Sequence, residues 1–340
     1  MSGSVYSTRR SFAALDGWAY DDHAAGLRAF LNSKSHTGDD AAFAGAPDLG
    51  EVAAHAYFES RFEPFAAPAD TPGFVTGYYE PELRGSHTKT PPYSVPVYGR
   101  PADLVTMIGE TERARYNDTV TGFRQTAEGA VPYHTRAEIE AGALAGQGLE
   151  VLYTDDYIEL FFMQVQGSGL IHLDDGTSLR LTYVGKNGHP YTSIARVLID
   201  AGELAADEID MEVVKTWLRY DPARGRALMQ KNESYVFFSA LSKSDEMEVP
   251  RGAEGVPLTP GRSLAVDPAY IPLGSPVFVT VPDLEDGDGF PFRRLMIAQD
   301  AGSAIQGPQR GDIFFGTGES AGAIAGRTRF AAQFHVLMRK

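Results

Sequence analysis

The sequence of 340 residues contains no cysteine. This absence excludes disulfide bonds, thiolate metal sites, iron–sulfur clusters and a cysteine nucleophile, and it leaves no cysteine within these residues to carry a lipid anchor. No apolar run approaches the ~18 residues that a membrane helix needs. Arg9 and Arg10 stand near the start, but no apolar stretch of signal-peptide length follows them, so we interpret the N-terminus as mature or truncated sequence.

Basic residues are also scarce. The chain has 30 Lys and Arg against 45 Asp and Glu, a formal net charge of −15, which argues against a protein that follows a nucleic-acid backbone with a basic face. Glycine, proline and aromatic residues are plentiful, with 36 Gly, 21 Pro, 16 Tyr and 19 Phe. Many turn residues together with many aromatic residues favour a β-rich protein with short strands.

The two flanks of the chain carry simple patterns. Hydrophobic residues recur at three- and four-residue steps between 8 and 64, which predicts helices there. The run 74–79 predicts a strand, and the proline-broken run 91–98 predicts an edge strand. After residue 255, short apolar runs alternate with glycine and proline turns. The elements expected in this last part are strands at 263–266, 277–281, 295–298, 312–315 and 333–337 and a short helix at 319–325.

The middle of the chain mixes strand and helix signals. The runs 149–153 and 158–165 predict buried strands, and the turn 174–177 predicts a hairpin between 170–173 and 179–183. At about 150 residues per domain, the length predicts two domains. Because both flanks are β-rich, we expect a barrel domain interrupted by an inserted domain. The other elements expected here are helices at 136–145, 192–201 and 210–218 and a strand at 235–238.

Three aspartates stand at the ends of predicted strands. Asp300 follows one strand, Asp312 begins the next, and Asp267 ends an earlier one. Carboxylates at the strand ends of one small sheet can converge on one rim, and the neighbouring glycines let a ligand approach the backbone. Taken singly, each aspartate also fits a turn, because Asp beside Gly or Pro is common turn chemistry. The set of three therefore indicates a site more strongly than any one member.

Two further clusters combine amides, hydroxyls and aromatic rings. They are Gly77-Tyr78-Tyr79-Glu80-Pro81 and Gln164-Val165-Gln166-Gly167-Ser168-Gly169. Such groups suit sugar rings, which need hydrogen bonds to their hydroxyls and stacking against their C–H faces. The alternative interpretations are a strand with one tyrosine in the core and a strand that ends in a glycine turn.

Other motifs are weaker. Asp300-Ala-Gly-Ser303 and Asp174-Asp-Gly-Thr177 have the shape of the pepsin-like aspartic protease motif, but Ala and Asp replace the usual Thr or Ser after the first aspartate, and the second motif fits a hairpin turn. The eight histidines are scattered without metal-ligand spacing, and the nucleophile-elbow and P-loop patterns are absent.

The ordered motifs together resemble the MltA family of lytic transglycosylases from bacterial cell walls. The resemblance covers roughly residues 70–340, and its last part resembles the 3D domain, whose three aspartates match Asp267, Asp300 and Asp312. Where the family has a lysine this chain has Gln306, and Pro308-Gln-Arg-Gly stands before Asp312. The motifs are Gly77–Pro81, Gln164–Gly169, Asn232-Glu-Ser-Tyr-Val-Phe-Phe238, Pro257–Pro268 with Ile271-Pro-Leu-Gly274, and Asp300–Gly307 through Gly311-Asp312-Ile-Phe314.

The resemblance implies a mainly β fold. A double-ψ β-barrel domain with N-terminal helices is expected from residues 1–99 and 232–340, and an inserted β-rich domain of the MltA type from residues 100–231. A groove between the two domains would hold a glycan strand of peptidoglycan. The resemblance implies no metal and no organic cofactor, and the acidic net charge argues against nucleic acid as a partner.

The implied reaction cleaves the β-1,4 bond between N-acetylmuramic acid and N-acetylglucosamine without water and leaves a 1,6-anhydro end. One carboxyl group suffices if it first donates and then accepts a proton, and a raised pKa keeps it protonated at the start. We expect Asp312 in this role, Asp300 in support, and Asp267 as a structural residue. Substrate contacts are expected from Tyr78, Tyr79, Glu80, Gln164, Gln166, Gly167, Ser168, Gly169 and Ser303.

The resemblance also implies a periplasmic location. Association with the outer membrane would run through an N-terminal segment outside this chain, and other cell-wall enzymes are further expected partners. Two alternatives stay open. The first is a glycoside hydrolase on the same barrel, in which Asp300 or Glu80 activates water. The second is a glycan-binding module without catalysis.

Overall fold

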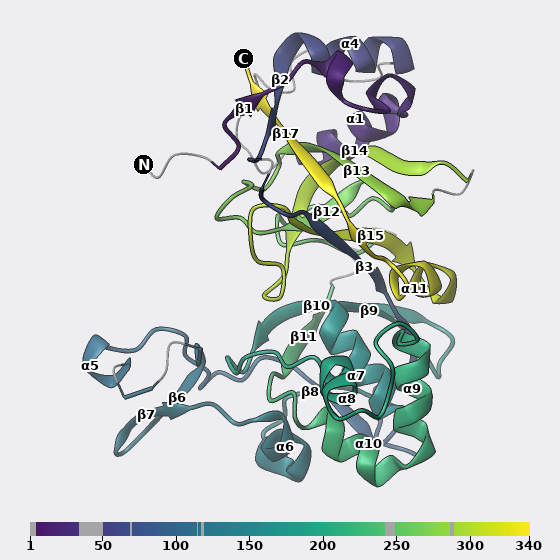
Figure 1. Ribbon diagram of the computed structural model, residues 1–340. Coiled ribbons are helices and arrows are strands. Elements are labelled where there is room, and N and C mark those ends of the chain that lie inside the picture. The colour runs from purple at the N-terminus through teal and green to yellow at the C-terminus, as the bar shows by residue number, and fades with distance from the viewer. Residues whose placement is uncertain are drawn as a thin grey trace. The chain divides into compact units, whose positions relative to one another are not determined.

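The computed structural model describes residues 5–33, 50–68, 70–113, 115–116, 119–241, 249–285 and 289–340 (Figure 1). The chain divides into two compact units. The first unit consists of Met1–Tyr79 and Met247–Lys340, and the second of Glu80–Glu246. The second unit is thus inserted into the first. Among the helices of the described ranges, none has the length and hydropathy to cross a membrane.

The borders of the inserted unit differ from the expected range of 100–231. Strands β4 (Glu82–Ser86), β5 (Val95–Tyr98) and β11 (Val236–Ala240) pair with strands of the second unit. Their strand pairing therefore places residues 82–98 and 236–240 in the inserted unit rather than in the barrel. Strand β5 lies at an edge of its sheet, as its prolines predict.

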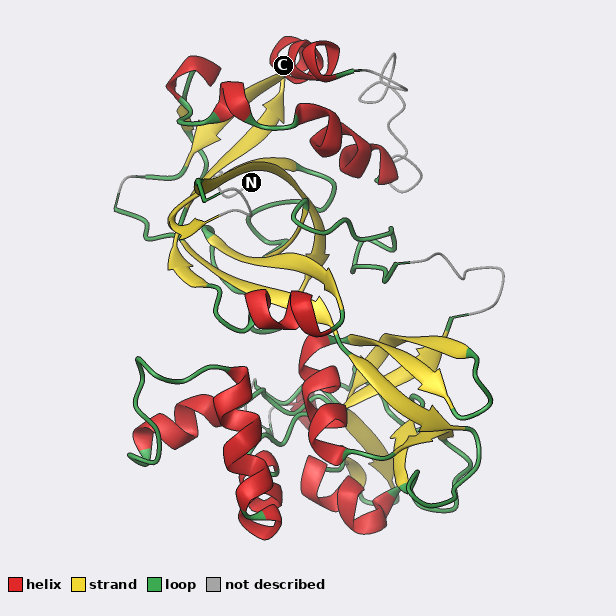
Figure 2. Ribbon diagram, turned by 90° about the vertical axis from the view of Figure 1, so that its right-hand side faces the viewer, coloured by secondary structure: helices red, strands yellow, loops and turns green. Residues whose placement is uncertain are grey.

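The first unit is built on a nine-stranded sheet that joins both ends of the chain. Figure 2 shows its strands curving into a barrel, as expected for a double-ψ β-barrel. All five strands predicted after residue 255 are confirmed, and so is the helix α11 (Glu319–Ala325). In sheet order the strands are β1 (Thr8–Arg9), β2 (Phe62–Ala66), β17 (Gln333–Arg339), β13 (Pro276–Glu285), β14 (Pro291–Ala301), β12 (Ser263–Val266), β15 (Arg310–Thr317), β3 (Phe74–Glu80) and β16 (Arg329–Ala331).

Strand β13 is buried on both of its faces. Val277, Val279 and Val281 point into the barrel core, whereas Phe278 points to the opposite face. There it packs against Trp18, with ring centroids 5.4 Å apart. One face of the strand packs in the barrel interior, and the other packs against the N-terminal layer, which is formed by the described residues between 12 and 61. The strand is therefore a nearly continuous apolar run.

The N-terminal layer holds, in its described part, fewer helical residues than the pattern over 8–64 predicts, because Thr8–Arg9 and Phe62–Ala66 form strands. It contains α1 (His23–Asn32) and α4 (Glu51–Arg61), with two short 3₁₀ turns at Phe12–Ala14 and Trp18–Tyr20. The Asp22 carboxylate caps α1 by accepting from the Ala25 amide at 2.8 Å. The part of the predicted helical region at 34–49 lies outside the described residues.

The second unit contains a six-stranded sheet in the order β11-β10-β9-β4-β8-β5. The predicted hairpin is confirmed by strands β9 (Ser168–Leu173) and β10 (Ser178–Lys186), and Gly176 adopts a φ of 85° in the turn. Strand β8 (Glu150–Thr154) confirms the strand predicted at 149–153. The remaining elements are α5 (Glu110–Arg113), β6 (Phe123–Thr126), β7 (Gly129–Pro132), α6 (Arg136–Glu138), a π-helical turn (Ile139–Ala143), α8 (Ile194–Asp200), α9 (Met211–Tyr220) and α10 (Pro222–Met229).

The predicted strand at 158–165 is wrong, because these residues form helix α7 (Tyr157–Gln166). Asp156 caps its start by accepting from the amides of Ile158 and Glu159, and Gly167 ends it with a φ of 88°. The helix packs apolar residues into two separate clusters of the unit. Since several of its faces are buried, its apolar residues run together and hide the helical period.

Candidate active site

Asp300 and Asp312 are brought together by the register of three neighbouring strands. Ala265 on β12 lies opposite Asp300 on β14 and opposite Asp312 on β15. Residues paired directly across strands project to the same face of a sheet, so the two carboxylates flank the small Ala265 side chain. With neighbouring strands about 4.8 Å apart, the Cα atoms of the two aspartates are separated by about 10 Å.

A β-bulge turns Asp300 toward this face. The pairing of β12 with β14 steps from Leu264–Ala298 to Ala265–Asp300 and so skips Gln299. An inserted residue of this kind re-aims the side chains that follow it. Gln299 is buried, and its amide binds the Ser263 hydroxyl at 2.6 Å and the Ala29 carbonyl at 2.8 Å. The bulge therefore directs the Gln299 side chain to buried hydrogen-bond partners and the Asp300 side chain to the face that carries Asp312.

Asp312 has the properties of a group that both donates and accepts a proton. It is half-buried, and the Thr76 hydroxyl donates a hydrogen bond of 2.6 Å to its Oδ1. Burial raises the pKa of Asp312 to about 6, while the Thr76 hydrogen bond and the Arg310 charge oppose that rise and the Asp300 charge adds to it. Both protonation states are therefore accessible near neutral pH.

Asp300 is surrounded by donors that stabilise its charged form. The Tyr78 hydroxyl donates to Oδ2 at 2.8 Å, and the Ala253 and Ala301 amides donate to Oδ1 at 2.8 Å each. Burial raises the pKa of Asp300 above its ordinary value, and these three hydrogen bonds oppose that rise without cancelling it. Burial and the two aspartates hold the pKa of Tyr78 well above its usual range, so Tyr78 keeps its proton and remains a donor.

Asp267 is tied to backbone amides. Its Oδ1 accepts from the Ala269 amide at 3.0 Å and its Oδ2 from the Gly307 amide at 2.8 Å. These contacts join the end of β12 to the loop that follows Asp300. They support the structural role expected for Asp267 rather than a chemical one.

The tyrosine pair is packed inside the first unit. The Tyr78 ring lies against Phe314 with centroids 5.2 Å apart. Tyr79 is also buried, and its ring covers Gly322 of α11 so closely that a Cβ there would come within 2.8 Å of it. Tyr79 therefore packs between β3 and α11 and offers no open ring face to a sugar, which corrects the expected substrate contact. Tyr78 reaches the site through its hydroxyl alone.

Glu80 is engaged in a buried ion pair within the second unit. Its two carboxylate oxygens accept from Nε and Nη2 of Arg180 at 2.7 and 2.8 Å, and the Glu80 side chain is fully buried. A carboxylate held by both oxygens in this way contributes to packing rather than to substrate binding. The expected substrate contact at Glu80 is therefore corrected.

Gln164 is likewise internal. Its Oε1 accepts from Nη1 of Arg136 at 2.6 Å, and its Nε2 donates to the Val236 carbonyl at 3.2 Å. Arg136 also donates to the Asn232 and Ser234 carbonyls at 3.0 and 2.7 Å. The buried amide thus holds the second unit together and is not available to a substrate.

Three predicted substrate contacts at the end of α7 are partly accessible to solvent, so they stay candidates for substrate binding. Gln166, Gly167 and Ser168 are half-buried, and the space beside the Gly167 Cα is open. Gly169 is buried, and a Cβ there would lie 2.3 Å from the Met163 sulfur, so its role is close packing. Ser303 is exposed in the loop after β14.

Sequence reasoning missed Thr76 and Arg310. The Thr76 hydroxyl accepts from Nη2 of Arg310 at 2.8 Å and donates to Asp312. The available signal was the spacing of two, because side chains at i and i+2 of a strand share a face. Thr76 precedes Tyr78 by two residues on β3, and Arg310 precedes Asp312 by two on β15.

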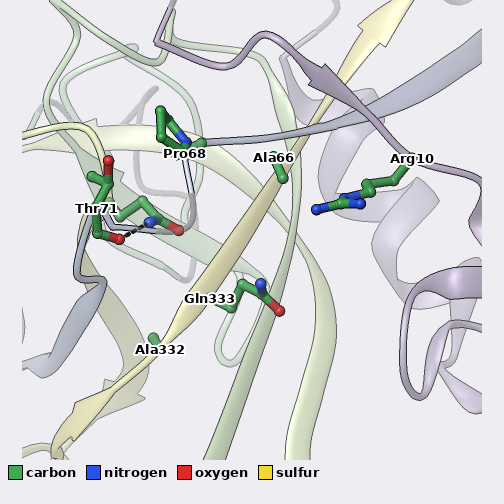
Figure 3. A pocket seen from close by; sticks show the side chains of 8 residues that line it. Arg10, Ala66, Pro68, Thr71, Ala332 and Gln333 are labelled. Atoms are coloured by element: carbon green, nitrogen blue, oxygen red, sulfur yellow. Dashed lines mark hydrogen bonds between the residues drawn. The ribbon is translucent and has the colours of Figure 1, made fainter.

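A pocket of about 210 Å³ lies elsewhere on the first unit (Figure 3). Arg10 is the charged residue in its lining, and no carboxylate lines it. Gln309 donates to the Thr71 carbonyl there, as the dashed line in Figure 3 marks. The aspartates are therefore not in this pocket. Its other lining residues are Ala66, Ala67, Pro68, Ala332 and Gln333.

Gly77 provides a test of how tightly β3 is held beside the site. A Cβ at Gly77 would come within 2.6 Å of the Phe315 ring and 2.8 Å of the Ala325 Cα. We expect Gly77→Ala to lower the free energy of unfolding by about 1–3 kcal/mol and to reduce activity, as measured by urea denaturation and turnover. Gly109→Ala is the matched control, because nothing lies within 4 Å of a Cβ at Gly109. Equal stability of the two variants would contradict the packing argument.

Comparison with known proteins identifies two matched regions. Residues 74–239 match the family model described as the MltA specific insert domain, and residues 262–338 match the 3D domain. The membrane-bound lytic murein transglycosylase A of Escherichia coli strain K12 is 36% identical over 265 residues, which cover 76% of this chain and 64% of that protein. The protein of the same name from Vibrio cholerae is 36% identical over 256 residues, which cover 74% and 61%. The alignment thus spans less than two thirds of these relatives.

Solved structures resemble the chain over nearly its whole length. The membrane-bound lytic murein transglycosylase from Agrobacterium tumefaciens superimposes with a TM-score of 0.90 at 34% identity and covers 98% of this chain and 97% of its own. MltA from Neisseria gonorrhoeae gives 0.81 at 32% identity, with coverages of 97% and 92%. Escherichia coli MltA with bound chitohexaose gives 0.74 at 28% identity, with coverages of 99% and 96%.

Proposed function

The chain belongs to the MltA family, and from this membership we propose that it is a lytic transglycosylase acting on peptidoglycan. The proposed reaction cleaves the β-1,4 bond between N-acetylmuramic acid and N-acetylglucosamine and leaves a 1,6-anhydro-muramyl end. The observation that carries the proposal is the pair of aspartates on either side of Ala265, one of which titrates near pH 6.

In the proposed mechanism, Asp312 acts twice. Protonated Asp312 donates to the glycosidic oxygen while the bond to C1 breaks and positive charge develops on the sugar ring. The resulting Asp312 carboxylate then takes the proton of the C6 hydroxyl, whose oxygen bonds to C1. Asp312 ends the cycle protonated, and no water is consumed.

Asp300 supports this cycle as a fixed negative charge. Three donors hold its carboxylate in place and favour its charged form, although burial raises its pKa. Its charge raises the pKa of Asp312 and favours the positive charge that develops on the sugar ring. This division of labour assigns the acid and base steps to Asp312 and the electrostatic support to Asp300.

The structure weighs against both alternatives. A hydrolase on this barrel needs a second carboxylate to activate water, but three donors occupy Asp300 and Arg180 occupies both oxygens of Glu80. A half-buried carboxyl whose pKa is raised to about 6 beside a second aspartate favours catalysis over binding alone.

A glycan strand is the proposed ligand, since a relative of the same fold has been solved with bound chitohexaose. The proposed contacts to it remain Gln166, Gly167, Ser168 and Ser303.

We also propose a periplasmic, outer-membrane-associated location, because the curated relatives are named membrane-bound.

A murein digest in water labelled with oxygen-18 tests the function. We expect clearing of a murein suspension and muropeptides that are one water lighter than reducing ends and carry no label, as read by mass spectrometry. Labelled reducing ends would show a hydrolase instead. Binding to murein without clearing would show a module that does not cleave it.

A further inference from the structure

Three groups form a hydrogen-bonded chain that ends on the proposed acid. Nη2 of Arg310 donates to Thr76 Oγ1 at 2.8 Å, and Thr76 Oγ1 lies 2.6 Å from Oδ1 of Asp312. The chain joins two strands, because Arg310 and Asp312 belong to β15 and Thr76 belongs to β3. In sequence, Thr76 and Asp312 are 236 residues apart.

The direction of each hydrogen bond in this chain is fixed by chemistry. A guanidinium group only donates, so Thr76 must accept from Arg310. The hydroxyl has a single proton, and the Asp312 oxygen is the acceptor found for it within the described residues. Oδ1 of Asp312 is therefore held as an acceptor, and the proton of the acid form must reside on Oδ2.

Arg310 is itself held in place. It is half-buried, its guanidinium lies over the Phe74 ring with 5.5 Å between the Cζ atom and the ring centroid, and Nη1 donates to the carbonyl of Gly311. These contacts together with the Thr76 hydrogen bond define one orientation for the side chain. Arg310 therefore holds the Thr76 hydroxyl in a fixed direction.

The described elements around Asp312 carry few charged side chains. Its own strand contributes Arg310, and β14 contributes Asp300. Strand β12 places Ala265 opposite Asp312, and β3 presents the neutral Thr76 and Tyr78. Strand β16 adds Arg329, which pairs with Thr76 in register but is exposed, and α11 adds the exposed Glu319. Among the described residues, Arg310 is the cation that lowers the pKa of Asp312, and it opposes the effects of burial and of Asp300.

We propose that Arg310 is a positioning residue for Asp312 that acts through the Thr76 hydroxyl and determines which carboxyl oxygen carries the acid proton. The proposal rests on the proposed transglycosylase function. In the first step, the arrangement directs the Oδ2 proton toward the glycosidic oxygen. In the second step, the arginine charge stabilises the carboxylate that must wait for the C6 hydroxyl proton.

Two substitutions test separately the effect of the Arg310 charge and the effect of the Thr76 hydroxyl on Asp312. Arg310→Gln removes the cation, and Thr76→Val removes the hydroxyl at nearly constant volume. Each change removes an influence that lowers the pKa of Asp312, so the acid form persists to higher pH. We expect the alkaline limb of the kcat/KM profile to move up by about one pH unit in each variant, and kcat at the optimum to fall about tenfold.

Conservative variants supply the rescue. Arg310→Lys keeps the charge and Thr76→Ser keeps the hydroxyl, so the alkaline limb should return to the wild-type position in both. If Arg310 acts through Thr76, the double variant Thr76→Val with Arg310→Gln should lose less kcat than the product of the two single losses. Arg327→Gln is the matched charge control, because Arg327 is exposed in the turn that follows α11 and donates to the Ala323 carbonyl.

A carbon-13 NMR titration of the Asp312 carboxyl gives a readout that does not depend on activity. Asp312→Asn assigns the signal, and its midpoint should rise in Arg310→Gln and stay unchanged in Arg327→Gln. A fall in kcat without any movement of the alkaline limb or the midpoint would overturn the proposal and leave Arg310 with a packing role. If the wild type forms no anhydro product, the proposed function fails, and the NMR midpoints still decide whether Arg310 acts on Asp312.

Discussion

Replacement of Asp312 by asparagine is expected to abolish the anhydro product, with a rate loss on the order of 10⁴-fold. The amide has the shape of the carboxyl group and its oxygen can still accept the Thr76 hydrogen bond, but it neither donates a proton to the glycosidic oxygen nor takes one from the C6 hydroxyl. Mass spectrometry of a murein digest measures the loss, and circular dichroism checks that the fold is intact.

The same substitution should stabilise the protein. The carboxyl titrates near pH 3.8 in the unfolded chain and near pH 6 in the fold, so the folded state resists ionisation. As pH rises from about 4 to 6 the wild type therefore loses stability, on the order of 1–3 kcal/mol, and the asparagine variant avoids that loss. Urea denaturation at pH 7 should favour the variant, and the difference should vanish toward pH 4.

Asp283→Asn is the control for these measurements, because Asp283 is exposed on β13 of the same unit. It should change neither turnover nor the pH dependence of unfolding. Full activity of Asp312→Asn would remove Asp312 from the acid and base roles. Activity lost only in Asp300→Asn would transfer those roles to Asp300.

Arg180→Ala should be among the most destabilising changes in the second unit. It leaves the Glu80 carboxylate without its two donors in a fully buried place, and an unpaired buried charge of this kind costs about 3–5 kcal/mol. We expect a matching fall in the free energy of unfolding by urea. The double variant Glu80→Leu with Arg180→Met, which replaces the pair by apolar groups of similar size, should recover much of that loss.

Replacement of Glu80 by glutamine tests whether Glu80 has a structural role or a catalytic role. If the ion pair is structural, Glu80→Gln lowers stability, and the folded fraction keeps its turnover. If Glu80 instead activates water, Glu80→Gln loses turnover with an unchanged unfolding curve. The second outcome would restore the hydrolase alternative.

The barrel strands were predictable because their signals are local. Short apolar runs between glycine and proline turns identified strands β12 to β17 apart from the three-residue β16, and the strand ends identified Asp267, Asp300 and Asp312. The resemblance to one family added the assignment of the acid. These parts of the prediction needed no knowledge of which residues meet in space.

The residues assigned to the wrong role share a different cause. Glu80 and Gln164 stand in motifs with glycine and aromatic residues, and such motifs look the same whether the polar group meets a sugar or a buried arginine. Their partners are distant in sequence, Arg180 being 100 residues from Glu80 and Arg136 being 28 from Gln164. Only the fold determines these pairs.

The bulge at Gln299 was also beyond prediction. A shift of one residue in a strand exchanges its two faces, and nothing in the local pattern distinguishes Gln299 from Asp300 as the residue that faces the site. The outcome depends on whether β12 and α1 provide partners for the glutamine amide. The helix α7 was misread for a related reason, since burial on several faces removes the periodic signal.

The insertion of one unit into the other has a consequence for how the chain is made. Residues 80–246 form a continuous stretch that can pack as soon as it leaves the ribosome, whereas β2 and β3 must wait for β15, β16 and β17 before the barrel can close. The hydroxyl that contacts Asp312 is synthesised 236 residues before it. Thr76 and Asp312 can therefore meet only after β15 has been made, so the proposed active site forms after the inserted unit has been synthesised.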